Sequence, residues 1–184
     1  MANSKKTLLL TGASRGIGHA TVKHFHAAEW RVITVSRQPF DKICPWPQGE
    51  KDHIQVDLND VDQYPDMIEK IRGKLAEPET GGKLAALVNN AGISPKLEGG
   101  RRMGALETSL ATWQNVFNVN LFAPALLGQG LFEELKAAQG SVVNASIRRA
   151  AKPLASASRP PWRMEPEVSS TMQCSCGSAL LRGW

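Results

Sequence analysis

The sequence predicts an α/β fold with a doubly wound parallel sheet that stops after a fifth strand. Short aliphatic and β-branched runs alternate with stretches of helical period between residues 6 and 145. Several of these runs are apolar at nearly every position, as in strands buried on both faces. A glycine-rich turn separates the first run from the first helical stretch. Strands that alternate with helices form βαβ units, and right-handed crossovers then place helices on both faces of the sheet.

The first half of the chain supplies three of the expected strands. They are KTLLLTG at 6–12, RVITVSR at 31–37 and HIQVDL at 53–58. A helix is expected from about Gly16 to Ala28, with apolar residues at helical spacing. The segment 37–52 contains three prolines, so we expect a loop there instead of a full crossover helix.

The second half continues the alternation. A helix is expected over 64–76, a strand in LAALVNNAG at 84–92 and a last strand in SVVNA at 141–145, where Val142 and Val143 look buried. One long helical pattern runs from Leu106 to Ala138. The loop at 94–104 follows the fourth strand, and loops at the carboxyl ends of parallel strands are where such sheets bind ligands.

Composition and charge exclude several classes of protein. The chain has 184 residues and a net charge of +5, but six of its 22 basic and two of its 17 acidic residues follow residue 147. Residues 1–147 therefore carry only +1, which gives no case for a nucleic-acid or membrane surface. No apolar run approaches the roughly 18 residues of a membrane helix, and the start of the chain lacks a signal-peptide pattern.

The cysteines indicate a reducing compartment. Three cysteines without a secretory pattern suit the cytoplasm better than a disulfide framework. Cys174 and Cys176 form a C-x-C pair with no further His or Cys nearby, so we expect no metal site.

The turn TGASRGIG at 11–18 carries the first functional signal. Gly12 permits a tight turn, Gly16 lets a phosphate approach the backbone, and Gly18 lets the helix pack closely. The N–H groups and the positive dipole end of the following helix suit a pyrophosphate. A strand before the turn and a helix after it favour a dinucleotide-binding Rossmann site over an incidental glycine-rich turn.

The turn and three later motifs together resemble the short-chain dehydrogenase/reductase family. Members of that family carry T-G-x-x-x-G-x-G in the first turn and N-N-A-G after the fourth strand, which here is Asn89 to Gly92. They also carry an acid after the third strand that touches adenine, here Asp57, and an asparagine in the fourth helix, here Asn120. The resemblance covers about residues 6–146. It implies hydride transfer between a nicotinamide cofactor and a carbonyl or alcohol substrate.

Charge after the second strand predicts a cofactor preference. Folds that choose NAD often place an acid there for the ribose hydroxyls, whereas this chain has Arg37, and Arg15 lies in the glycine turn. A guanidinium binds a 2′-phosphate with two charged hydrogen bonds. We therefore expect NADP(H) in preference to NAD(H), the alternative being that Arg37 is a solvated loop charge. The cofactor-binding residues expected are Gly12, Ser14, Arg15, Gly16, Ile17, Gly18, Arg37, Asp57, Leu58, Asn90, Ala91 and Gly92.

The catalytic residues of the family match poorly. The resemblance implies a Ser after the fifth strand and a Tyr-x-x-x-Lys on the next helix. The single tyrosine is Tyr64, upstream of N-N-A-G, with Ile68 four residues later, so we expect a surface or helix-start residue. In VNASI, Ser146 occupies the first of two serine positions and Ile147 the second, catalytic one. The catalytic candidates are therefore Asn120 and Ser146, and turnover is expected to be impaired.

The chain is expected to divide at residue 147. Residues 1–147 form an incomplete dinucleotide-binding domain, and 148–184 form an irregular tail that is either disordered or translated out of frame. Two other functions stay open: a non-catalytic NADP(H)-binding module and an inactive truncated product. The fifth strand would then be a sheet edge, and Trp113, Phe117 and Leu121 would face solvent or a second copy of the long helix.

Overall fold

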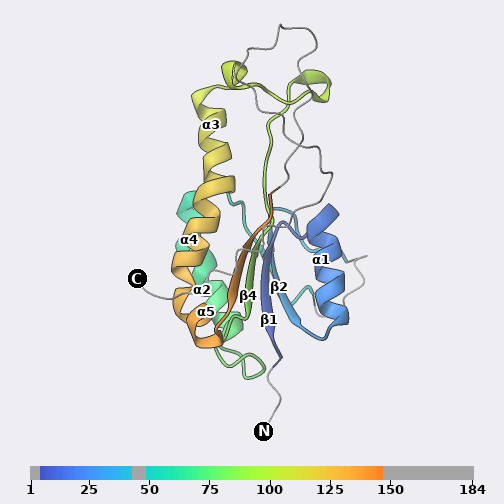
Figure 1. Cartoon of the computed structure of the whole chain (residues 1–184), viewed down its shortest axis with the longest axis vertical. Helices are drawn as coiled ribbons and strands as arrows, with labels where there is room; N and C mark the ends of the chain where they lie inside the picture. The colour runs from blue at the N-terminus through green and yellow to red at the C-terminus, as the bar shows by residue number, and fades with distance from the viewer. Residues whose placement is uncertain (1–4, 43–48, 147–184) are drawn as a thin grey trace, which may run out of the picture.

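The computed structural model describes residues 5–42 and 49–146, which form one parallel sheet between two layers of helices (Figure 1). The sheet order is β3-β2-β1-β4-β5, and every pairing is parallel. The strands are β1 (Thr7–Thr11), β2 (Arg31–Ser36), β3 (His53–Gln55), β4 (Ala86–Asn89) and β5 (Ser141–Asn144). This order confirms the doubly wound fold, in which the chain moves outward in both directions from β1.

Helices cover the two faces unequally. On one face lies α1 (Gly16–Ala27), and on the other lie α2 (Tyr64–Leu75), α4 (Ala123–Gly130) and α5 (Phe132–Ala138). The helix α3 (Leu110–Phe117) continues the line of α4 beyond the carboxyl end of the sheet (Figure 1). Short turns of 3₁₀ helix complete the elements: η1 (Val61–Gln63), η2 (Glu98–Gly100) and η3 (Ala105–Glu107).

The expectation of one helix from 106 to 138 is wrong, because the segment is interrupted. Between α3 and α4 lies a π turn, η4 (Asn118–Phe122), in which the Ala123 N–H bonds the Asn118 carbonyl five residues back. Pro124 has no N–H to donate to the carbonyl four residues before it, so a regular α-helix cannot continue there. A second break occurs at Leu131, between α4 and α5.

Two apolar clusters hold the layers together. Leu8, Leu10 and Val32 pack with Val22 of α1 on one face. The larger cluster fills the other face, where strand residues such as Leu9 meet α2, α4 and α5. Full burial of each such aliphatic side chain stabilises the fold by about 1.5–3 kcal/mol.

A buried ionic network fixes the outer strand. Arg31 at the start of β2 donates to both carboxylate oxygens of Asp52, at 2.9 and 2.6 Å. It also donates to the Lys74 carbonyl, the Thr80 hydroxyl and the Glu77 carboxylate. Arg31 is only 6% exposed, and the Asp52 carboxylate raises its pKa, so the guanidinium stays charged. The network ties β2 and the start of β3 to the end of α2.

The β5 side differs from the expected buried strand. Among the described residues β5 pairs only with β4, and Val142 is 38% exposed. The expected edge position is thus confirmed, while the expected burial of Val142 is wrong. Trp113, Phe117 and Leu121 are also exposed, as expected.

Tyr64 begins α2, so the helix-start alternative is the correct one, and its side chain is buried. Its hydroxyl donates to the Leu58 carbonyl at 2.7 Å, and burial raises its pKa to about 12.

Candidate cofactor site

The glycine turn is built on two left-handed residues and one very close contact. Gly12 and Gly16 have φ of +71° and +58°. A Cβ at Gly18 would lie 2.2 Å from the Gly12 carbonyl oxygen, so the helix approaches the turn as closely as the expected packing role requires. At Gly16, by contrast, a Cβ would meet nothing within 4 Å. The turn is therefore tightly packed where Gly12 meets Gly18, and it has free space beside Gly16.

A polar clamp from β4 holds this turn in place. The Asn90 side chain donates to the carbonyls of Thr11 and Gly12, at 3.1 and 3.0 Å. In return the Thr11 hydroxyl accepts from the backbone N–H groups of Asn90 and Ala91. The role of Thr11 was not predicted from the sequence, although Thr precedes the first glycine of the motif. These bonds make Asn90 and Ala91 part of the support of the turn.

The start of α1 presents donors to the open side. Its N-cap is Arg15, which makes no side-chain capping bond, and the first turn contains no acidic residue. The first N–H groups of a helix have no partner within the helix, and the helix dipole adds partial positive charge there. Ser14 and Ile17 flank this point and are exposed. The open space, the free donors and the absence of an acidic residue from the first turn of α1 fit a phosphate group.

The two expected arginines lie at the exposed surface. Arg15 is in the turn, and Arg37 follows directly after β2. The Arg37 carbonyl accepts a hydrogen bond from the Gln55 side chain at 3.0 Å. A cavity of about 220 Å³ lies between the glycine turn and this segment, lined among others by Ser14, Ser36 and Gln38. This one cavity therefore borders both the carboxyl end of β2 and the glycine turn.

Asp57 and Leu58 follow β3 and differ in exposure. Asp57 is half-buried, and its carboxylate accepts from the Asn59 N–H at 2.9 Å. Leu58 is buried in the core, and its carbonyl is bonded to Tyr64. The Leu58 side chain therefore supports the site from beneath and does not line its surface.

Asn120 lies in the π turn, where its side chain is fully engaged. Its Oδ1 accepts from the Ile93 N–H at 2.8 Å, and its Nδ2 donates to the Ile93 carbonyl at 2.9 Å. Gly92 sits next to this pair, since a Cβ there would be 3.5 Å from Asn120 Oδ1. The structure thus brings Asn120 and the N-N-A-G segment together.

Ser146 is the last residue that the structure describes, and it is exposed. The strand leading to it is held to β4 by the Asn89 side chain, which donates to Asn144 Oδ1 at 2.9 Å, and by the Ala145 N–H bonded to the Asn89 carbonyl. Ser146 therefore emerges at the same carboxyl edge as N-N-A-G. The family's second serine position, Ile147, lies outside the described residues, as do residues 148–184 and all three cysteines.

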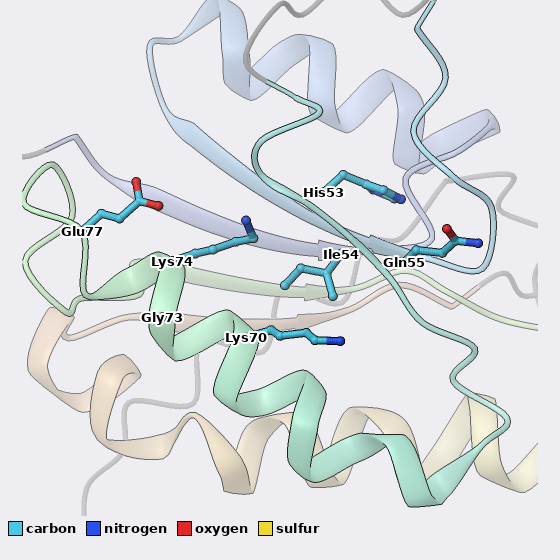
Figure 2. A pocket seen from close by; sticks show the side chains of 7 residues that line it. All are labelled: His53, Ile54, Gln55, Lys70, Gly73, Lys74 and Glu77. Carbon is cyan, nitrogen blue, oxygen red and sulfur yellow. The ribbon is translucent and has the colours of Figure 1, made fainter.

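The larger cavity, of about 380 Å³, lies elsewhere. Figure 2 shows it at the outer edge of the sheet, between β3 and α2, with Lys70, Gly73 and Lys74 on its helical side. None of the expected cofactor residues lines it. The smaller cavity is the one next to the glycine turn, so size alone does not locate the site.

Residues 5–42 and 49–146 contain no cluster of three His, Cys, Asp or Glu side chains arranged to hold a metal ion. Within those ranges, no helix has the length and apolar character required to cross a membrane.

Comparison with known proteins identifies the family. The family model described as short chain dehydrogenase matches residues 6–159. The chain therefore belongs to the short-chain dehydrogenase/reductase family of oxidoreductases, whose members bind NAD(P) in a Rossmann-like fold.

Three relatives illustrate the match. Protein FixR of Bradyrhizobium diazoefficiens is 57% identical over 140 residues, covering 76% of this chain and 49% of FixR. A crystal structure of a Brucella ovis oxidoreductase of this family, in complex with a partially ordered NAD, is 63% identical with a TM-score of 0.71, covering 76% of this chain and 62% of that one. A metagenomic short-chain oxidoreductase in complex with NADP is 27% identical with a TM-score of 0.62, covering 78% and 62%. The chain spans about half the length of FixR.

Proposed function

We propose that this chain binds NADP(H) in preference to NAD(H), within an oxidoreductase framework that acts on a small carbonyl or alcohol substrate, and that its own turnover is impaired. The observation that carries the proposal is the glycine turn, which is open at Gly16 and flanked by Arg15. The two relatives in complex with NAD and with NADP support dinucleotide binding by this chain.

The proposed contacts follow the carboxyl edge of the sheet. Phosphate groups would be held by the turn residues and the first N–H groups of α1, and the adenosine end by Arg37 and by the segment after β3. The proposed cofactor-binding set is Gly12, Ser14, Arg15, Gly16, Ile17, Gly18, Arg37, Asp57, Leu58, Asn90, Ala91 and Gly92. A bound nicotinamide dinucleotide supplies or accepts a hydride.

Electrostatics supports the preference for NADP(H). Arg37 stands where an acid would bind ribose hydroxyls, and among the described residues no carboxylate forms an ion pair with Arg15 or Arg37. The two guanidinium groups are thus available to a 2′-phosphate, which a guanidinium can bind with paired charged hydrogen bonds.

The chain's own residues supply little acid/base chemistry. Both ends of the Asn120 amide are bonded to Ile93, so that side chain is a positioning element. Tyr64 is buried with its hydroxyl on the Leu58 carbonyl, so it cannot replace the family's tyrosine. Ser146 remains the proposed catalytic hydroxyl. Loss of a positioned acid or base lowers the rate by roughly 10²–10⁴, so binding is expected to outlast turnover.

We also propose an oligomeric state, a cellular location and a domain boundary. The exposed face containing Trp113, Phe117 and Leu121 is the surface we propose for a homo-oligomer. The odd number of cysteines supports a cytoplasmic location. We retain residue 147 as the boundary between the dinucleotide-binding domain and the tail at 148–184.

The test is a pair of fluorescence titrations of the full chain with NADPH and NADH. We expect tighter binding of NADPH, and Arg37→Ala should weaken it by about tenfold, since charged hydrogen bonds contribute about 1.5–3 kcal/mol when well formed. Lys70→Ala is the matched control, because it removes a cation that lines the other cavity. Equal affinity for the two cofactors, unchanged by Arg37→Ala, would contradict the preference.

Turnover is measured separately, as loss of NADPH absorbance on addition of a carbonyl compound. Binding without turnover supports a non-catalytic NADP(H)-binding module. The absence of both binding and turnover would identify an inactive truncated product.

A further inference from the structure

Four polar side chains stand together on the second half of β2 and on β3. Thr34 and Ser36 of β2 lie in register with His53 and Gln55 of β3, on the face of the sheet that α1 covers. Nearer the start of β2, Val32 on the same face packs into the apolar cluster with α1. Thr34 and Ser36 are nevertheless buried, and a buried polar group destabilises the fold unless it forms hydrogen bonds.

The hydrogen bonds of this group converge on two consecutive carbonyls. Ser36 Oγ and His53 Nε2 bond the Gln38 carbonyl, at 3.0 and 2.9 Å, and Gln55 Nε2 donates to the Arg37 carbonyl at 3.0 Å. The remaining member, Thr34, bonds His53 Nδ1 at 2.9 Å. The backbone on both sides of the Arg37–Gln38 peptide bond is therefore held from the neighbouring strand.

His53 suits this task in its neutral form. A carbonyl oxygen can only accept, so the ring carries its hydrogen on Nε2, and Nδ1 accepts from the Thr34 hydroxyl. Burial lowers the pKa of His53, which favours the same form. Ile54, the residue between His53 and Gln55, belongs to the apolar cluster on the opposite face, and Figure 2 shows it on the α2 side of the strand.

We infer that His53 and Gln55 are positioning residues that aim Arg37 and thereby set the discrimination between cofactors with and without a 2′-phosphate. This inference rests on the proposed function. Two held carbonyls fix the backbone at Arg37, and hence the direction in which its side chain leaves the strand. A guanidinium that starts from a fixed backbone loses less conformational entropy when it binds a ligand, which is the general advantage of preorganisation.

The position of the smaller cavity supports this reading. His53, Thr34, Ser36 and Gln38 line it together with Ser14 of the glycine turn. Thr34, Ser36 and His53 therefore form part of the wall of the cavity between the turn and the Arg37 segment, and Gln55 holds that segment from outside the cavity. A change in that wall moves Arg37 relative to the turn, and the turn itself is held independently by Asn90.

The experiment measures NADPH and NADH binding to the full chain carrying Gln55→Ala, His53→Ala or His53→Gln. We expect Gln55→Ala and His53→Ala to weaken NADPH binding by about three- to tenfold, the value of one ordinary hydrogen bond, and to leave NADH binding nearly unchanged. His53→Gln keeps an N–H donor and should restore most of the loss. Lys70→Ala again serves as the control for charge and edge position.

A double-mutant cycle separates positioning from general stabilisation. In an Arg37→Ala background, the added Gln55→Ala or His53→Ala change should alter NADPH affinity by less than about twofold, because coupled residues are not additive. The inference is overturned if the β3 substitutions weaken NADPH and NADH binding equally. It is also overturned if they weaken NADPH binding as much in the Arg37→Ala background as in the unaltered chain. If His53→Ala fails to fold, the exposed Gln55→Ala decides the question alone.

The outcomes also distinguish this inference from the proposed function. If Arg37→Ala weakens NADPH binding and neither β3 variant does, only the positioning role is overturned. If the unaltered chain binds no NADPH, the proposed function fails and the inference falls with it.

Discussion

The two sides of β4 differ in how well the neighbouring strands and loops are buried. On the β1 side, the strands are buried and the loops are clamped by side chains such as Asn90 and Thr11. On the β5 side, the last strand is exposed and apolar residues of α3 and η4 face outward. The half of the fold that contains the glycine turn is therefore stabilised by contacts within the described chain, whereas no element covers the β5 flank among the described residues.

The largest contrast is expected from one substitution made on each side. Leu9→Ala in β1 removes a fully buried side chain and should lower the free energy of unfolding by about 2–5 kcal/mol. Leu121→Ala in η4 changes a side chain that is 51% exposed and should alter it by no more than about 0.5 kcal/mol. Urea unfolding followed by circular dichroism measures both.

Self-association sharpens the same contrast. Leu121→Ala should reduce concentration-dependent association in sedimentation velocity, because it removes part of the exposed apolar face. Similar losses of stability in the two variants would show that the β5 flank is covered after all.

A smaller effect is expected from two glycines in helices. Gly18→Ala would press a methyl group against the Gly12 carbonyl and should cost about 1–3 kcal/mol, with loss of cofactor binding. Gly128→Ala in α4 meets nothing within 4 Å and should stabilise the chain by about 0.5–1 kcal/mol through helix propensity. Thermal melts with and without NADPH report both values. A tolerated Gly18→Ala would mean that α1 can move away from the turn.

The smallest effect concerns pH at the contact between the two regions. Tyr64 bonds Leu58 near the π turn, and its pKa is raised to about 12 by burial. Because the folded pKa exceeds the unfolded value of about 10, its contribution is complete below pH 10 and is lost between about pH 10 and 12, by at most about 2 kcal/mol.

Tyr64→Phe tests that assignment. The variant loses one hydrogen bond, but its stability should fall less steeply over the same pH range. Since Tyr64 is the single tyrosine of the chain, ultraviolet difference absorbance follows its ionisation directly. Ionisation near pH 10 in the folded chain would contradict a buried hydroxyl.

Much of the fold could be predicted from local pattern, and the exceptions have physical causes. Apolar and β-branched runs predicted all five strands within a few residues, and for β1 and β2 the reason is burial on both faces, which admits few other side chains. The unbroken helix over 106–138 was wrong because periodicity does not reveal the π turn before Pro124. The burial of Tyr64 was not predicted, because it depends on Asn118 and Leu58, which meet it only in the folded chain.

The candidate site was predictable to the extent that its residues are sequential. The glycines and N-N-A-G were found because their spacing is local, whereas the Thr11–Asn90 clamp joins residues 79 positions apart. The β3 pair was missed for a similar reason, since His53 and Gln55 act on a segment 15 to 18 residues earlier. Polar residues at alternate positions in a strand next to a candidate cofactor segment were the available signal.

The central position of β1 has a consequence for synthesis on the ribosome. β1 is made first, yet its partner β4 and the side chain of Asn90 emerge about eighty residues later. Contacts so distant in sequence form slowly, because the intervening chain must first be closed into a loop. The glycine turn therefore acquires its final shape late, because a nascent chain shorter than about ninety residues lacks the Asn90 side chain that bonds the turn.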